Sequence, residues 1–202
     1  MTAVSKIGIM GGTFDPIHYG HLVTAQEAHS YFGLDKVIFM PTGIAPHKEP
    51  SKISEAKQRY VMTVMATSNN EAFDVSDIEV NKTTPSFTIE TLAELKKQFP
   101  DSDFYFITGA DAIMEILTWK EPEKMVRMAK FVAATRPGFS LTQFRELIKD
   151  IQPAPEVFEL EVPALAISST DIRKRVREER PIRYLLPDKV WRYIYSKGFY
   201  RA

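Results

Sequence analysis

The sequence predicts an α/β protein with a Rossmann-like, doubly wound and mostly parallel sheet, followed by a helical C-terminal segment over residues 168–202. Two observations support this fold class. Short apolar runs typical of buried strands alternate with stretches whose apolar residues recur at helical spacing. Glycine or proline follows these apolar runs, as expected where a strand ends and the chain turns. The length of 202 residues suits a single domain over residues 1–202.

The first two expected strands flank the first expected helix. Residues 6–10 form an apolar run that suits a buried strand, and the pair Gly11–Gly12 behind it is expected to turn the chain. Apolar positions at spacings of three and four predict a helix over residues 22–32, which Gly33 would end. The run 37–41, whose last residue is proline, predicts the second strand.

Two helices and two strands are expected in the middle of the chain. Residues 54–68 suit a helix, and residues 89–99 suit another that ends before a proline. The apolar runs 104–108 and 130–135 predict strands. The expected apolar side of the first of these helices consists of Tyr60, Val61, Val64 and Met65.

A ligand site is expected where the parallel strands end. In a doubly wound fold, ligands bind at the carboxyl ends of the strands, near the point where the strand order reverses. Gly11–Gly12, Gly109 and Arg136 each follow an expected strand and therefore belong to that edge. The loop 41–54 is long and rich in proline, and a loop of this kind beside a ligand edge is often a mobile cover.

Charge and composition limit which partners, site chemistries and locations are expected for this protein. Lys and Arg together number 26, as do Asp and Glu, so no overall field draws the protein to nucleic acid or to a membrane. There is no cysteine, which excludes disulfides, thiolate metal sites and cysteine nucleophiles and fits a reducing compartment. The sequence shows neither the apolar block of a signal peptide nor a run long enough to cross a membrane. A cytoplasmic location is therefore expected.

Two histidines mark the first candidate site. His18 and His21 follow the strand and the glycine pair, where a helix is about to begin. The free backbone N–H groups of a helix N-terminus attract anions, and an imidazole can donate a hydrogen bond to a phosphate oxygen. Metal ligation and nucleophilic attack are alternatives, although no third metal ligand stands at a recognisable spacing. A pair of imidazoles suits charge stabilisation better than either alternative.

The segment 167–173 is the second candidate site. Ser168 and Asp171 fit a capping box at the start of a helix. Ser169 and Thr170 then lie in the first turn with hydroxyls to spare, and Arg173 is one turn further on. Hydroxyls, amides and a guanidinium at a helix N-terminus suit a second anion. Two such sites in one chain suit a polyphosphate held at both ends.

A local basic segment follows the second candidate site. Between residues 173 and 183 six basic side chains stand against two acidic ones, in a chain that is otherwise balanced. A solvated helix face and a binding surface for a small anion both explain such a segment. The basic residues are Arg173, Lys174, Arg175, Arg177, Arg180 and Arg183.

The two candidate sites together resemble the signature of the nucleotidyltransferase superfamily that carries a His-x-Gly-His motif. Here the motif is His18-Tyr19-Gly20-His21, and the second segment reads Ile167-Ser168-Ser169-Thr170-Asp171-Ile172-Arg173. Within the superfamily the chain is most similar to the bacterial nicotinate-nucleotide adenylyltransferases, over nearly its whole length. Further segments that match that family are Gly11 to Leu22, Pro46 to Lys48, Thr84 to Thr88, Gly109 to Asp111, Trp119, and Arg136 to Gly138.

The resemblance implies a reaction and a set of site residues. Adenylyl would pass directly from ATP to nicotinate mononucleotide, giving deamido-NAD and pyrophosphate in NAD biosynthesis, with Mg²⁺ carried by the ATP. The implied catalytic residues are His18, His21, Lys48 and Arg173. The implied nucleotide-binding residues are Gly11, Gly12, Thr13, Phe14, Thr84, Thr88, Gly109, Asp111, Trp119, Arg136, Ser169 and Thr170.

Within this set, Thr84 to Thr88 and Trp119 would surround the nicotinate ring, and Asp111 would accept from ribose hydroxyls. Phe87 departs from the family, which often has tyrosine there.

Other functions remain open at this point. A sister enzyme would use phosphopantetheine or nicotinamide mononucleotide as acceptor, or CTP as donor. A nucleotide sensor that has lost catalysis is a different class, although it would not need both His18 and His21. The aromatic residues of the C-terminal segment would cover the core or form the surface of a homodimer.

Overall fold

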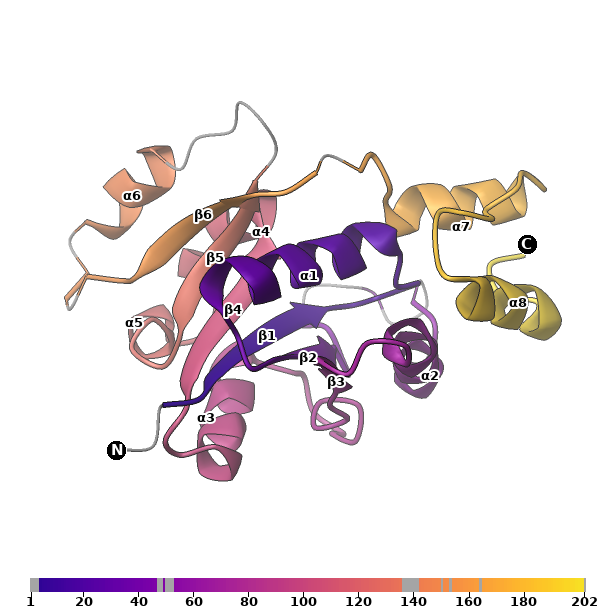
Figure 1. Cartoon of the computed structure of the whole chain (residues 1–202). Coiled ribbons are helices and arrows are strands. Elements are labelled where there is room, and N and C mark those ends of the chain that lie inside the picture. The colour runs from indigo at the N-terminus through magenta and orange to yellow at the C-terminus, as the bar shows by residue number, and fades with distance from the viewer. Residues whose placement is uncertain are drawn as a thin grey trace.

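The computed structural model describes residues 4–46, 49, 53–135, 142–149, 151–152, 154–163 and 165–201, apart from the side chains of Asp111, Gln143 and Leu147. Strands and helices alternate along the chain, as Figure 1 shows. The strands are β1 Lys6–Gly12, β2 Lys36–Pro41, β3 Phe73–Val75, β4 Asp103–Gly109, β5 Lys130–Thr135 and β6 Val157–Glu161. The helices are α1 Tyr19–Phe32, α2 Ala56–Thr67, α3 Thr88–Gln98, α4 Ala110–Met114, η2 Ile116–Thr118, α5 Pro122–Met125, α6 Thr142–Ile148, α7 Ser169–Arg177 and α8 Asp188–Lys197.

The strands form one six-stranded sheet in the order β3-β2-β1-β4-β5-β6. Each pairing among them is parallel, including the central pair in which Ile9 lies opposite Ile38 on one side and Phe106 on the other. This is the doubly wound order, which reverses between β1 and β4. The predicted fold class is confirmed, and the C-terminal segment is helical as expected. The single domain over residues 1–202 stays a prediction.

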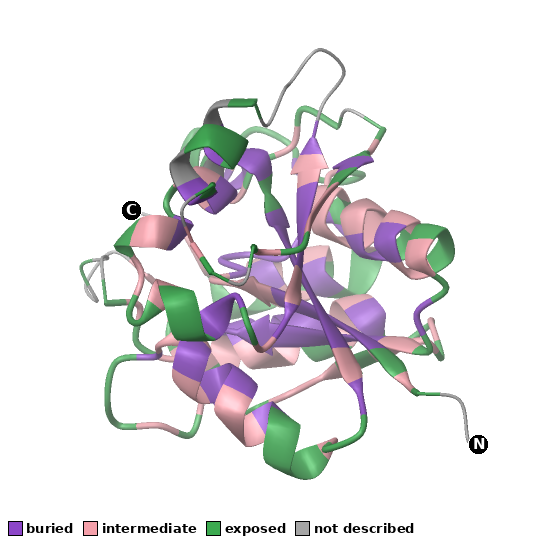
Figure 2. Ribbon diagram, turned by 90° about the vertical axis from the view of Figure 1, so that its left-hand side faces the viewer, coloured by how far each residue is buried: buried purple, intermediate pink, exposed green. Residues whose placement is uncertain are grey.

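Both faces of the sheet are buried, because alternate residues of each strand enter different cores. Ile7 and Ile9 pack with α3, α4, α5 and α6, whereas Met10 of the same strand packs with α1, α2, α7 and α8. Figure 2 shows the buried residues concentrated in the sheet and on the inner sides of these helices. Burial on two faces explains why the strands read as continuous apolar runs. Among the helices described, none is both long and apolar enough to cross a membrane.

Two expectations about local structure are wrong. Gly11 and Gly12 do not turn the chain but are the last residues of β1, paired with Met40 and Pro41. Helix α2 buries Arg59, Met62, Thr63 and Thr67 instead of the expected apolar side, and Val64 is exposed. The threonine hydroxyls donate to backbone carbonyls four residues back, Thr63 to Arg59 and Thr67 to Thr63, so they are satisfied inside the helix. Polar residues with such partners can be buried, and apolar periodicity does not reveal them.

Candidate active site

The connection from β1 to α1 is a tightly packed loop. Phe14 adopts a left-handed backbone conformation with φ of 49°, and its ring is buried. A Cβ at Gly12 would lie 2.7 Å from the Phe14 ring, so residue 12 must lack a side chain. The peptide bond between Asp15 and Pro16 is cis, and Ile17 behind it is fully buried. The glycine at position 12 therefore serves the packing of the loop and not a turn.

This loop brings the two histidines together at the start of α1. His18 is the N-cap residue in an extended conformation, and its ring stacks on that of His21 with centroids 3.7 Å apart. The backbone N–H of His18 donates to Nδ1 of His21 over 3.2 Å. A Cβ at Gly20 would lie 3.0 Å from the His18 ring, so the glycine of the motif makes room for the stack.

Both imidazoles are uncharged in the free protein. Burial lowers the pKa of His18 to about 4. Burial, and then the neighbouring His18, lower the pKa of His21 well below its ordinary value. Because Nδ1 of His21 accepts a hydrogen bond, its proton must be on Nε2, which leaves an N–H donor without any positive charge. Nδ1 of His18 is buried and finds no partner in the described part of the chain. Such an atom is unusual unless water or a ligand reaches it.

The N-terminus of α7 lies against this loop, although about 150 residues separate the two segments. Ser169 Oγ donates to the carbonyl of Pro16 over 2.8 Å. Arg173 donates to the carbonyl of Asp15 over 2.7 Å and approaches the hydroxyl of Thr170 at 3.4 Å. The two predicted anion sites are thus one site.

The predicted N-cap of α7 is confirmed, but the carboxylate of Asp171 accepts from Arg175 and not from Ser168 as a capping box requires, and one hydroxyl is not spare. Ser168 is the N-cap, and its hydroxyl accepts from the backbone N–H of Asp171 over 3.1 Å. Ser169 was expected to offer its hydroxyl to a ligand, yet the proton of that hydroxyl is donated to Pro16. The side chain of Ser169 therefore fastens two parts of the protein together, and the N–H groups of the first turn are the donors that remain.

Asp15 and Arg59 also hold the loop in place, and no sequence pattern marks Arg59. The carboxylate of Asp15 is buried and accepts from the hydroxyl of Tyr200 over 2.7 Å and from the N–H of Ser54 over 3.3 Å. Arg59 is 2% exposed and donates to three carbonyls, those of Thr13, Gly43 and Ser54. Burial lowers the pKa of Arg59, and Asp15 acts against this.

A cavity of about 370 Å³ opens at the carboxyl ends of β1 and β4, where the strand order reverses. Five of the predicted nucleotide-binding residues line it, namely Gly11, Gly12, Thr13, Thr88 and Trp119. Five others lie outside its lining: Thr84 and Gly109 are exposed, Phe14 is buried within the loop, and Ser169 and Thr170 begin α7. The mixture of apolar walls with hydroxyl and carboxylate groups suits a small, polar, flat ligand.

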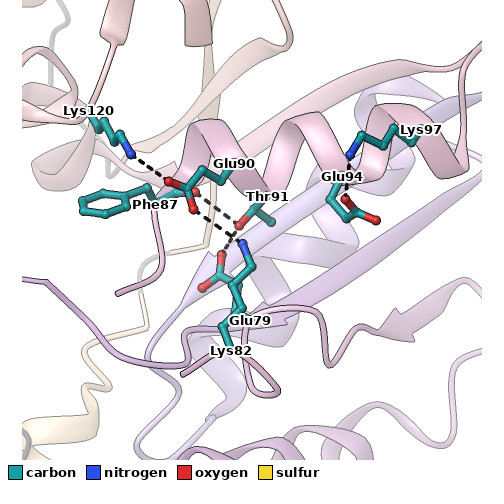
Figure 3. A network of polar contacts seen from close by, with 8 residues as sticks. All are labelled: Glu79, Lys82, Phe87, Glu90, Thr91, Glu94, Lys97 and Lys120. Carbon is teal, nitrogen blue, oxygen red and sulfur yellow. Dashed lines mark hydrogen bonds and ion pairs between the residues drawn. The ribbon is translucent and has the colours of Figure 1, made fainter. Parts of the chain in front are cut away.

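Trp119 stands at one wall of this cavity. Its ring meets Phe106 edge to face, with centroids 5.9 Å apart. The next residue, Lys120, pairs with Glu90 of α3 over 2.7 Å and lies 4.5 Å above the ring of Phe87 (Figure 3). These contacts tie the Trp119 segment to the start of α3. Phe87 therefore contributes a ring face at the position where the family often has tyrosine.

A buried acid, Glu79, also lines the cavity and was not foreseen. Its carboxylate accepts from the hydroxyl of Thr91 over 2.6 Å (Figure 3). Burial raises the pKa of Glu79. A Cβ at Gly43 would lie 2.0 Å from the carbonyl oxygen of Glu79, and the N–H of Ser86 donates to the carbonyl of Ile44 over 2.9 Å. Glu79 thus belongs to a closely packed wall made of three loops.

For three predicted site residues the structure describes no side chain. Lys48 and Arg136 lie outside the described residues. Asp111 lies in α4 directly behind β4, but its side chain is not described. Their roles stay predictions.

The start of α7 and the loop that carries His18 and His21 form one site, called the joined site below. This site and the fold together define a class of protein. The model of the Cytidylyltransferase-like family matches residues 9–175, a span that contains both histidines and the start of α7. A protein of Moorella thermoacetica is 50% identical over 100% of this chain and 94% of the relative, and one of Thermoanaerobacter is 51% identical over 97% and 94%. Both are named as probable nicotinate-nucleotide adenylyltransferases. The chain belongs to the nicotinate-nucleotide adenylyltransferase family.

A solved structure agrees with the fold. The nicotinic acid mononucleotide adenylyltransferase of Plasmodium falciparum superposes with a TM-score of 0.78 over 97% of both chains, at 24% identity. It has been solved in complex with APC and in complex with NaAD. At this identity the likeness concerns the arrangement of the chain.

Proposed function

We propose that the joined site carries the reaction of the family, transfer of adenylyl from ATP to nicotinate mononucleotide. The observation that carries the proposal is the contact between the His18–His21 loop and α7, made by Ser169 on Pro16 and Arg173 on Asp15. This contact places two imidazoles, a guanidinium and the N-termini of α1 and α7 around one spot, beside a cavity at the switch point of the sheet. Donors converging in this way suit a polyphosphate.

Adenylyl transfer depends mainly on the alignment of the two substrates and on stabilisation of the negative charge of their phosphates. A phosphate oxygen of the mononucleotide attacks the α-phosphorus of ATP, the bond from that phosphorus to the bridging oxygen breaks, and pyrophosphate leaves. His18 and His21 would donate to the phosphate oxygens, and Arg173 would hold the phosphates that leave. Since neutral His21 already presents Nε2–H, donation does not require prior protonation. A bound anion would nevertheless favour the charged imidazole, opposite to the effect of burial.

The nicotinate ring would enter the cavity beside Trp119. An indole offers a flat face to a pyridine ring, and Thr88 and the loop in front of α3 offer hydroxyl and amide donors to its carboxylate. The cavity also carries the acids Glu79 and Glu115. Because burial raises the pKa of Glu79, this side chain opposes an incoming carboxylate less than an ordinary glutamate would.

Mg²⁺ would come with the ATP and would help to neutralise the phosphates. Among the described residues, no three His, Cys, Asp or Glu side chains gather into a metal-binding group. We therefore assign no protein ligand to the metal and derive no step through it. A cytoplasmic location, where ATP is available, and a homodimer also stay proposals; size-exclusion chromatography with light scattering tests the second.

The experiment that tests the function is pyrophosphate release from Mg-ATP with different acceptors. Nicotinate mononucleotide, nicotinamide mononucleotide and phosphopantetheine would be compared at equal concentrations. Rapid release with nicotinate mononucleotide alone supports the proposal. Release with another acceptor would keep adenylyl transfer but replace the substrate, and ATP binding without any release would point to a nucleotide-binding protein.

A further inference from the structure

A second cavity, of about 500 Å³, lies beside the catalytic loop, the connection between β1 and α1 that carries Asp15 and His18. Arg173, Arg177 and Arg201 contribute to its lining, together with Asp15 and Tyr200. Arg173 and Arg177 are four residues apart in α7 and therefore lie on the same face of the helix. Three arginines from two distant segments thus line this cavity, and the guanidinium of Arg201 also lies 5.8 Å from the centroid of the Tyr195 ring. Asp15 is the one acidic side chain among the described residues of the lining.

The arginines of this cavity differ from the other cations of the basic segment. Lys174 and Arg180 pair with Glu178, Arg175 pairs with Asp171, and Arg183 pairs with Asp188. Within the described part of the chain, Arg177 and Arg201 have no carboxylate partner. The segment is thus divided between ion-paired surface cations and cations that face the cavity. The two oxygens of Asp15 accept from the neutral donors Tyr200 and Ser54, so one negative charge stands against three arginines in the lining.

Hydrogen bonds hold Phe199 and Tyr200, the residues in front of Arg201, in place. Tyr200 adopts a left-handed conformation with φ of 63°, a strained state for a residue with a large side chain. It is kept there by its hydrogen bond to Asp15, and the N–H of Phe199 donates to the carbonyl of Ile194 over 3.0 Å. These bonds hold the two residues that precede Arg201, which lines the cavity.

We propose that this cavity binds the pyrophosphate that leaves the reaction, with Arg177 and Arg201 as additional phosphate-binding residues beyond Arg173. The proposal rests on the proposed function. Arg173 faces both the catalytic loop, where it bonds Asp15, and the second cavity. The phosphates that contact Arg173 can therefore reach Arg177 and Arg201 as well, while the adenylyl group stays beside the histidines. Guanidiniums bind phosphate oxygens through charge-assisted hydrogen bonds.

The test reads pyrophosphate directly. In the reverse reaction, with deamido-NAD and Mg-pyrophosphate, Arg177→Ala and Arg201→Ala should each raise the KM for pyrophosphate about tenfold. The KM for the dinucleotide should stay unchanged. Arg180→Ala is the matched control, because Arg180 belongs to the same segment but pairs with Glu178 outside the cavity. All three substitutions concern exposed side chains, so circular dichroism and thermal unfolding should match the wild type.

Calorimetric titration with pyrophosphate gives a second readout that does not depend on turnover. The wild type and Arg180→Ala should bind it in competition with ATP, and the two cavity variants should bind it about tenfold more weakly. The inference is overturned if the cavity variants behave like Arg180→Ala, or if pyrophosphate binds without competing with ATP. A wild type that binds pyrophosphate in this pattern but catalyses no reverse reaction would contradict the proposed function and leave the subsite standing.

Discussion

His18 and His21 combine two properties that seldom occur together in surface histidines. They are stacked on each other at 3.7 Å, and burial keeps both uncharged in the free protein. Two charged imidazoles at this distance would repel each other, so a neutral pair is the arrangement that can be packed before ATP arrives. The negative charge of the phosphates would then favour protonation at the moment when a stronger donor is useful.

From this arrangement we expect both histidines to be necessary for the rate and neither to be necessary for the fold. His18→Ala and His21→Ala should each slow pyrophosphate release by roughly 10²–10⁴-fold, the usual effect of removing a positioned donor. Steady-state kinetics of each variant would check this, with thermal unfolding as the control for folding. Near-normal turnover in a folded double variant would remove the histidines from the mechanism.

Burial of the neutral pair also predicts how stability depends on pH. The pKa of His18 is about 4 in the folded protein and about 6.5 in an unfolded chain, so the unfolded state binds more protons between these values. The free energy of unfolding should therefore be greatest above pH 6.5 and fall by up to about 3 kcal/mol as the pH drops to about 4. Urea unfolding at a series of pH values measures it.

The control for this pH dependence is the double variant with His18→Gln and His21→Gln, which cannot titrate at these positions. Its stability should decline less steeply over the same range. Parallel curves for the wild type and the double variant would show that other groups cause the loss.

At the scale of single residues, the sequence indicates which side chains are suited to catalysis or binding better than it indicates which residues meet in the fold. The histidines, Arg173 and Trp119 stand in recognisable patterns and were predicted. Arg59, Glu79 and Tyr200 were missed, because each matters through partners far away in the sequence. A glycine also misleads: Gly12 is needed for the Phe14 ring and not for a turn, and only the folded loop shows that contact.

At the scale of elements, Arg59 of α2 links three connecting segments through hydrogen bonds to their carbonyl groups. Its guanidinium joins the loop behind β1 at Thr13, the loop behind β2 at Gly43 and the chain in front of α2 at Ser54. A planar group with five donors can serve three carbonyls at once, and an ammonium group on a flexible stem cannot do so in the same geometry.

Arg59→Lys should therefore destabilise the protein although it keeps the charge. We expect a loss of about 2–4 kcal/mol in the free energy of unfolding, since buried carbonyls lose their partners. Urea unfolding measures the loss, and Lys57→Met, an exposed change on the same helix, is the control. Equal stability of Arg59→Lys and the wild type would show that charge alone matters at this position.

The segment around Trp119 is the second element whose placement has a functional consequence. It is tied to α3 through Lys120 and Glu90 and lines the cavity with Thr88. Trp119→Ala should raise the KM for nicotinate mononucleotide several-fold more than the KM for ATP, because the ring faces the acceptor end of the site. Initial rates with each substrate varied in turn check this. Equal effects on both KM values would make Trp119 a structural residue.

At the scale of the whole molecule, the central strands and long helices follow from apolar periodicity, and the parallel sheet with helices on both faces follows from their alternation. The edge strands β3 and β6 were missed, because a run of three residues, or one interrupted by Glu159 and Glu161, gives no clear pattern. The meeting of α7 with the β1–α1 loop was expected from chemistry, since two anion sites suit one polyphosphate. Periodicity could not have indicated it, because the bonds from Ser169 and Arg173 go to backbone carbonyls.

A ligand that spans these distant segments should stabilise the entire fold. ATP at one hundred times its Kd should add about 2.7 kcal/mol to the free energy of unfolding and raise the Tm by about 5–10 °C in a chain of this size. Arg173→Ala should lose most of that rise at the same ATP concentration, because ATP would no longer be held by the side chain that α7 contributes. Arg180→Ala and Trp119→Ala should keep it, because Arg180 is ion-paired elsewhere and Trp119 lines the cavity proposed for the acceptor. Differential scanning calorimetry with and without Mg-ATP measures the shifts, and an undiminished rise in Arg173→Ala would mean that ATP is held without α7.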